Sequence, residues 1–140
     1  MGALFALRCP EEGLNMTTLS AAELVKKKCQ PCEGGVEPVS PAEAAKQIEK
    51  LPGWKLSADS KAIRKEWVVK DFMTAIKFFN AIADIAETED HHPDLHLTGY
   101  RNVVVELSTH AIKGLSENDF ILAAKIDQVP VELKKPAAQK

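Results

Sequence analysis

The sequence lacks any long hydrophobic run and any marked excess of one charge. Apolar runs such as Val103–Val105 have the length of a strand and fall far short of the roughly 18 residues that cross a bilayer. Eighteen Lys and Arg oppose 20 Asp and Glu, so the formal net charge is only −2. The sequence therefore predicts a soluble protein that binds neither a membrane nor, directly, a nucleic acid.

Cysteine is also scarce, and its number is odd. Cys9, Cys29 and Cys32 are the three cysteines. The apolar opening Met1–Arg8 has no basic segment before it, and acidic residues follow soon after it, which is a poor match to a secretory signal. A disulfide framework is therefore not expected. The predicted location is the cytoplasm, with import into an organelle as the alternative.

Cys29 and Cys32 nevertheless form a C-x-x-C pair. Two thiolates make only half of a structural zinc site, and neither Cys9 nor a nearby histidine completes it convincingly. The segment also lacks the strand and helix that flank a thioredoxin-type redox pair. We interpret the pair as inert. A zinc bridge between subunits and a redox or metal module are the alternatives.

The length of 140 residues suits one domain with shorter segments at its ends. Residues 1–17 lack periodicity, which predicts a flexible leader, and residues 129–140 combine Pro with Lys, which predicts a flexible tail. Residues 18–39 form an ordered lead-in that carries the C-x-x-C pair. The domain itself is predicted over residues 40–128.

Helix starts are marked by polar residues with the properties of caps. They are Ser20 before Glu23, Ser40 before Pro41 and Glu43, Asp71, and Ser116 before Asp119. After the second and third of these caps, apolar residues recur at three- and four-residue spacing, which predicts helices with one buried face. Those residues are Ala44, Ala45, Ile48 and Leu51, and then Phe72, Ala75, Ile76, Phe79, Ile82, Ala83 and Ala86.

Two pairs of alternating segments separate the helices. Trp54–Leu56 and Ala62–Val69 predict one hairpin, and Leu95–Thr98 and Asn102–Ser108 predict another around Gly99. The order is then helix, two strands, helix, two strands, helix. This order predicts an α+β fold, a two-layer domain with a four-stranded antiparallel sheet covered on one face by helices.

The four histidines of the chain all lie between positions 91 and 110, and this clustering is the strongest chemical signal. His91 and His92 fall where the long helix must end before Pro93, and His110 ends a predicted strand. A histidine that titrates near neutral pH both donates and accepts protons. The sequence therefore indicates histidine acid/base chemistry where a helix end meets a strand end.

Other interpretations exist for each histidine. A histidine at the carboxyl end of a helix is often only a cap. A zinc site is disfavoured because adjacent histidines do not easily turn both rings to one ion and the usual ligand spacing is absent. His96 is expected to face solvent on its strand.

Three short runs carry a family resemblance: Glu87-x-x-Asp90-His91-His92-Pro93, Ser108-Thr109-His110, and Gly114-Leu115-Ser116-x-x-Asp119. Together they resemble the defining pattern of the pterin-4a-carbinolamine dehydratases, and the likeness extends over roughly residues 40 to 128. The C-x-x-C lead-in and the Gly99 turn are more similar to plant, protozoan and bacterial members than to the vertebrate form. One extra residue relative to the vertebrate pattern is best placed at the Gly99 turn.

The resemblance implies a pterin pocket built by three histidines, His91, His92 and His110. It also implies pocket positions for Glu87, Trp54, Thr109 and Asp119, and Ser108 is a further candidate to hydrogen-bond the flat edge of the pterin. Neither a metal nor an organic cofactor is implied. The expected assembly is a homodimer or homotetramer.

The implied reaction is the loss of water from a 4a-hydroxytetrahydropterin to give a quinonoid dihydropterin, which recycles the pterin cofactor. A ring nitrogen next to the carbinolamine carbon expels the hydroxyl, so the enzyme protonates the departing oxygen and removes the nitrogen proton. His91 and His110 are the predicted acid/base pair, with His92 holding the pterin. Because vertebrate members also act as dimerisation cofactors for a homeodomain transcription factor, a protein-interaction role without catalysis is the alternative.

Overall fold

The computed structural model describes residues 18–29 and 38–135. The predicted leader, Cys9, Cys32 and the end of the predicted tail lie outside these residues. No helix in the described part of the chain is both long and apolar enough to cross a membrane.

The caps predicted from the sequence begin four α-helices. These helices are α2 (Ala21–Val25), α3 (Pro41–Ile48), α4 (Phe72–Glu89) and α5 (Glu117–Asp127). Ser20, Ser40 and Ser116 each form a reciprocal capping box with the acidic residue three positions later. Asp71 accepts the Thr74 N–H and so caps α4. Each helix therefore begins where a short side chain satisfies backbone donors that have no partner within the helix.

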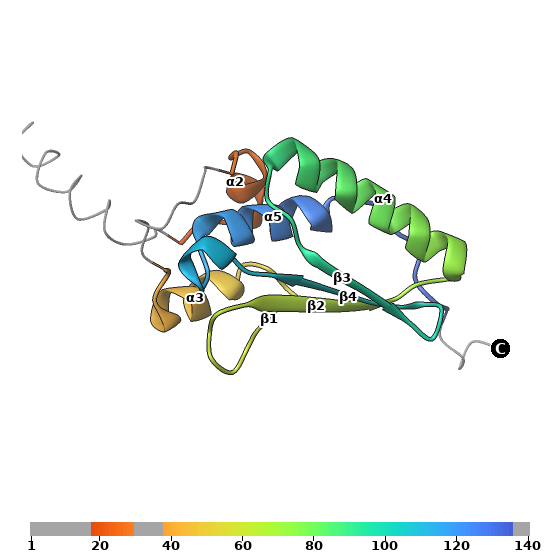
Figure 1. Cartoon of the computed structure of the whole chain (residues 1–140), viewed down its shortest axis with the longest axis horizontal. Coiled ribbons are helices and arrows are strands. Elements are labelled where there is room, and N and C mark those ends of the chain that lie inside the picture. The colour runs from red at the N-terminus through yellow and green to blue at the C-terminus, as the bar shows by residue number, and fades with distance from the viewer. Residues whose placement is uncertain (1–17, 30–37, 136–140) are drawn as a thin grey trace, which may run out of the picture.

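The four strands form one antiparallel sheet. They are β1 (Lys55–Leu56), β2 (Ile63–Val68), β3 (Asp94–Thr98) and β4 (Asn102–Leu107), in the order β1-β2-β4-β3. Figure 1 shows α4 and α5 lying together across one face of this sheet. The predicted α+β two-layer fold with a four-stranded antiparallel sheet is confirmed.

The hydrophobic core lies between the sheet and the helices. Alternate residues of β4, Val103, Val105 and Leu107, are fully or almost fully buried, as expected for a sheet with one covered face. Every residue from Asn118 to Ala124 in α5 is also buried, so α5 is enclosed rather than amphipathic. Asp119 is therefore carried into the interior by the helix that is most completely covered.

The buried faces of two helices differ from those predicted. On α4 the predicted Phe72 and Ala83 are exposed, while Phe78 and Glu89 are buried. On α3 Ala45 is exposed, and Gln47 is fully buried instead. The sequence missed Gln47 and Glu89 because apolar periodicity does not detect a buried polar side chain that has found partners.

The chain after α5 is also more ordered than predicted. The sequence predicts a flexible tail from Val129, but the Lys70 N–H donates to the Glu132 carbonyl and the Lys134 N–H to the Val68 carbonyl, both at 2.9 Å. Leu133 forms a bridge with Val69. β1 pairs with only the first two residues of β2. Beyond β1, backbone groups at the far end of β2 have no strand partner on that side within the described residues, and residues 132–134 cover them.

Candidate active site

The end of α4 places His91 and His92. α4 ends at Glu89, and Asp90 adopts the left-handed conformation (φ 56°, ψ 42°) that closes many helices. The His91 N–H then donates to the Ala86 carbonyl at 3.1 Å. The two histidines therefore stand at the carboxyl end of α4, between the helix and β3.

The end of β4 lies beside these histidines. Asp94, the first residue of β3, pairs with Glu106 of β4. His91 lies three residues before Asp94, and Thr109 lies three residues after Glu106, so both fall near the same end of the β3–β4 pair. His110 follows Thr109 and begins the short 3-10 helix η1 (His110–Ile112). Two segments that are distant in sequence thus bring three histidines to one end of the sheet.

A buried carboxylate joins the two segments. Asp119 is fully buried, and its Oδ1 lies 2.6 Å from His91 Nε2. Its Oδ2 accepts the Thr109 hydroxyl at 2.8 Å and the Ser116 N–H at 3.0 Å. An ionised carboxylate only accepts hydrogen bonds, so His91 Nε2 is the donor. The other ring nitrogen, Nδ1, is then the one left to exchange a proton when the ring is neutral.

Thr109 completes this network from within. Its side chain is buried, and its Oγ1 lies 2.8 Å from Ser116 Oγ as well as from Asp119. The Thr109 hydroxyl has a single proton, which it donates in the hydrogen bond to Asp119. In the second hydrogen bond, therefore, the Ser116 hydroxyl is the donor and Thr109 Oγ1 the acceptor. Ser116 was not predicted as a site residue. Its sequence signal was the cap of α5, and the same Asp119 carboxylate that closes the cap also holds His91.

The remaining predicted residues at this end are more accessible. His92 Nε2 lies 2.7 Å from Glu87 Oε2, and both side chains are largely exposed, at 56% and 77%. His110 is exposed, and Ser108 is half-buried. Because both side chains are exposed, they are available to a ligand. An exposed pair of this kind also adds little to stability.

Trp54 lies elsewhere. Its side chain is buried, its indole N–H donates to Asp127 Oδ2 at 3.0 Å, and it meets Trp67 edge-on at 5.9 Å. Asp127 is eight residues beyond Asp119 on α5, which corresponds to about 12 Å along the helix. The structure links His91 and Thr109 through Asp119 and pairs His92 with Glu87. Ser108 and His110 flank Thr109 in the chain, and Trp54 lies in the core at the other end of α5.

Glu89 is a further polar residue at this end of α4. Its side chain is 5% exposed and lies 2.6 Å from Lys125 Nζ. Burial is the largest influence on the carboxyl and by itself raises its pKa. The hydrogen bonds from Lys125 and from the Cys29 N–H outweigh burial, so the pKa of Glu89 lies below its ordinary value of 4.5. Glu89 is an unspecified position of the Glu-x-x-Asp-His-His-Pro run, so the motif did not single it out.

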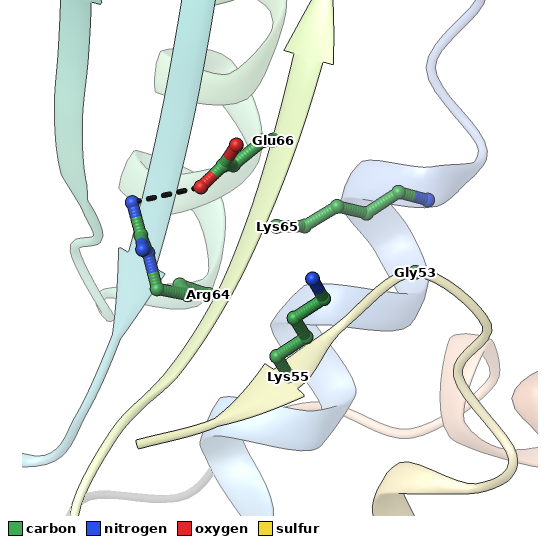
Figure 2. A pocket seen from close by; sticks show the side chains of 5 residues that line it. All are labelled: Gly53, Lys55, Arg64, Lys65 and Glu66. Atoms are coloured by element: carbon green, nitrogen blue, oxygen red, sulfur yellow. Dashed lines mark ion pairs between the residues drawn. The ribbon is translucent and has the colours of Figure 1, made fainter. Parts of the chain in front are cut away.

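A small pocket occurs on strands β1 and β2, and no histidine lines it. Figure 2 shows the residues that do, which come from the two strands and the turn before β1: Gly53, Lys55, Arg64, Lys65 and Glu66. Its volume of about 120 Å³ is well below the roughly 300–1,000 Å³ of typical ligand sites. Lys65 is already paired with Asp127 at 2.9 Å, and Arg64 with Glu66 at 3.1 Å. The candidate acid/base residues therefore lie at the histidines and not in this pocket.

The described residues contain no group of three or more His, Cys, Asp or Glu placed to hold a metal ion. The C-x-x-C pair falls only partly within them. Cys29 is half-buried, and its thiol lies 3.7 Å from the Asn118 carbonyl oxygen.

Comparison with known proteins identifies a family. The profile of the family described as pterin 4 alpha carbinolamine dehydratase matches residues 37–129. An Arabidopsis thaliana protein named pterin-4-alpha-carbinolamine dehydratase 2, mitochondrial, is 47% identical over 83% of this chain and 64% of its own length. A putative pterin-4-alpha-carbinolamine dehydratase of Nitrosospira multiformis is 49% identical over 75% of this chain and 90% of its own length.

A solved structure is similar as well. The crystal structure named transcriptional coactivator/pterin dehydratase from Brucella melitensis aligns with a TM-score of 0.61 and 33% identity, over 65% of this chain and 96% of that one. The chain spans less than two thirds of the Arabidopsis protein but nearly the whole of the bacterial ones. The resemblance predicted from the sequence is thereby confirmed, and the chain belongs to the pterin 4 alpha carbinolamine dehydratase family.

Proposed function

We propose that the protein is a hydro-lyase that removes water from a 4a-hydroxytetrahydropterin and returns a quinonoid dihydropterin for recycling. The observation that carries the proposal is the bond of His91 to the buried Asp119, 2.6 Å away, next to residues 108–110 that follow β4. A histidine held by a buried carboxylate is oriented for proton transfer. Membership of the dehydratase family names the substrate class.

In the proposed mechanism His91 and His110 transfer protons. The lone pair of the ring nitrogen next to carbon 4a forms a C=N bond while the bond from carbon 4a to the hydroxyl oxygen breaks. One histidine protonates the departing oxygen, which leaves as water, and the other accepts the proton of that ring nitrogen. Each transfer contributes about 10²- to 10⁴-fold in rate. Asp119 keeps the His91 ring in one orientation and one tautomer throughout.

The other residues are proposed to bind the substrate. His92, steadied by Glu87 at 2.7 Å, holds the pterin. Ser108 and the backbone at the end of β4 hydrogen-bond its flat amide edge. Thr109 and Asp119 support the site indirectly and do not contact the pterin, because their polar atoms already bond to each other and to Ser116. Trp54 was predicted to form a wall of the pocket, but it is buried at the other end of α5. Its place among the substrate-binding residues is therefore tested by measuring the substrate KM of Trp54→Phe.

We further propose a homodimeric or homotetrameric assembly. β3 is an edge strand of the sheet, and edge strands offer unpaired backbone groups to another chain. Phe72 and Met73 at the start of α4 are 49% and 58% exposed. Sedimentation velocity on the full chain measures the assembly, and a concentration-independent monomer contradicts it.

The second candidate function is protein binding without catalysis. The same exposed Phe72 and Met73 favour it, as does the word coactivator in the name of the Brucella structure. The two candidates differ in their dependence on the histidines. A binding role tolerates loss of His91 and His110, whereas the dehydratase does not.

The decisive experiment follows the loss of a 4a-hydroxytetrahydropterin generated in situ. The intact chain is compared with His91→Ala and His110→Ala, and each variant is checked for folding by circular dichroism. Acceleration that both substitutions abolish establishes the dehydratase and its acid/base pair. A folded, intact chain that gives no acceleration contradicts the proposal.

For location, we propose the cytoplasm, with organellar import as the alternative. The Arabidopsis relative is named as mitochondrial. Imaging the full chain with a fluorescent tag at its carboxyl end, with and without residues 1–15, separates the two.

A further inference from the structure

We propose that Glu89 is a positioning residue for His91, which it serves by tying the end of α4 to α5 and to the lead-in. The inference rests on the proposed acid/base role of His91. It concerns a residue that the histidine motif leaves unspecified, and a segment, residues 18–29, that lies before the family match at residues 37–129.

Glu89 binds two separate parts of the chain. One carboxylate oxygen accepts from Lys125 Nζ of α5 at 2.6 Å, and the other accepts the Cys29 N–H at 2.8 Å. Glu89 is the last residue of α4, and only Asp90 separates it from His91. The carboxylate therefore fixes the final turn of the helix that sets the His91 backbone.

The same two helices hold the His91 ring. His91 follows α4, and its partner Asp119 is on α5, six residues before Lys125. The Glu89–Lys125 and His91–Asp119 pairs thus span the same helix junction at two points, separated by about 9 Å along α5. A shift of the α4 end relative to α5 strains both pairs together, and the His91 ring moves with the junction.

The lead-in closes the junction from outside. Figure 1 shows α2 beside the end of α4 and next to α5. Leu24 of α2 is fully buried, and Lys27 pairs with Glu117 of α5 at 2.9 Å. Gln47 of α3 accepts the Leu19 N–H at 2.8 Å and donates to the Leu19 carbonyl at 2.7 Å. Residues 18–29 are thus anchored near both ends, at Leu19 and at Lys27. The Cys29 N–H is therefore a fixed donor for Glu89.

The test compares Glu89→Gln with a double variant and a matched control. Glu89→Gln removes the charge but keeps the shape, and it leaves the mostly buried Lys125 ammonium without its carboxylate. Glu89→Gln/Lys125→Met also removes that ammonium. It is therefore expected to be more stable in urea than Glu89→Gln, although the bond between α4 and α5 is still missing. Glu132→Gln is the control, since its side chain is 73% exposed and lies outside the site.

Kinetics on the full-length protein separate positioning from folding. We expect Glu89→Gln to lower kcat by about 10- to 100-fold, because a misplacement near 1 Å costs about 10²-fold, while KM stays within about twofold. The double variant recovers resistance to urea but not kcat, and Glu132→Gln matches the intact chain. If kcat returns together with stability in the double variant, or if Glu89→Gln is folded and fully active, the proposal is overturned.

A second readout does not depend on activity. In NMR spectra the His91 ring signals, assigned with a His91→Gln sample, are expected to change position in Glu89→Gln. The exposed His96 on β3 serves as the internal reference. Unchanged His91 signals overturn the positioning role even if the protein is a dehydratase. Altered His91 signals support it even if the intact chain proves inactive, in which case only the proposed function fails.

Discussion

Replacing Asp119 with Asn is the most informative single change at this site. The Ser116 N–H can only donate, so the amide oxygen of the new side chain takes the Oδ2 position, 3.0 Å from that N–H. The amide NH₂ group then occupies the Oδ1 position, 2.6 Å from His91 Nε2. Two donors face each other there, so His91 is forced into the opposite tautomer or out of its orientation.

The size of the effect follows from this reversal. In serine proteases the same substitution leaves the geometry intact but selects the wrong tautomer, which lowers kcat by about 10⁴-fold. The loss here is bounded by the whole contribution of His91, about 10²- to 10⁴-fold for one proton transfer. We therefore expect Asp119→Asn to lower kcat by about 10²-fold or more, and not beyond His91→Ala. Stability falls by about 2 kcal/mol, the value of one hydrogen bond to a charged group.

The assay is dehydration of the 4a-hydroxytetrahydropterin, measured with urea unfolding of the same samples. Asp127→Asn is the matched control, because Asp127 is also on α5 and holds Lys65 and Trp54 at 2.9 and 3.0 Å. It is expected to lose stability without a comparable loss of kcat. Equal rates for Asp119→Asn and the intact chain, or equal losses in both variants, would refute the argument.

Three further predictions concern stability and binding. The pKa of Glu89 is below its unfolded value, so its stabilising effect is complete above about pH 4.5 and is lost as pH falls through the lower folded pKa. Glu89→Gln should therefore cost about 3 kcal/mol at pH 7, and the difference from the intact chain should shrink in urea titrations below about pH 4. Gly53→Ala should destabilise the fold by at least about 1 kcal/mol in thermal unfolding, because Gly53 has φ +91° and the new Cβ would lie 2.8 Å from Lys65 Cε. Glu87→Gln should leave urea stability unchanged, because the pair with His92 is exposed, yet raise the substrate KM; an unchanged KM would remove Glu87 from the binding set.

Much of the fold was predictable because its signals are local. Ser20, Ser40 and Ser116 cap the helices that they were expected to cap, since a cap is a bond between residues three positions apart. The strands followed from alternation, and the end of α4 followed from Pro93. The family followed from short runs around the histidines, which place those side chains near helix and strand ends.

The tertiary structure decided what depends on distant partners. Asp119 meets His91 across 28 positions, Glu89 is buried because Lys125 and Cys29 bind it, and Trp54 turns toward Asp127. Residues 132–134 can bond to the backbone at the end of β2 because β1 pairs with only the first two residues of β2. The sequence by itself determined the elements, their caps and the set of histidines, because adjacent residues encode them. Packing alone determined which polar groups are buried and paired, because that depends on how the helices meet over the sheet.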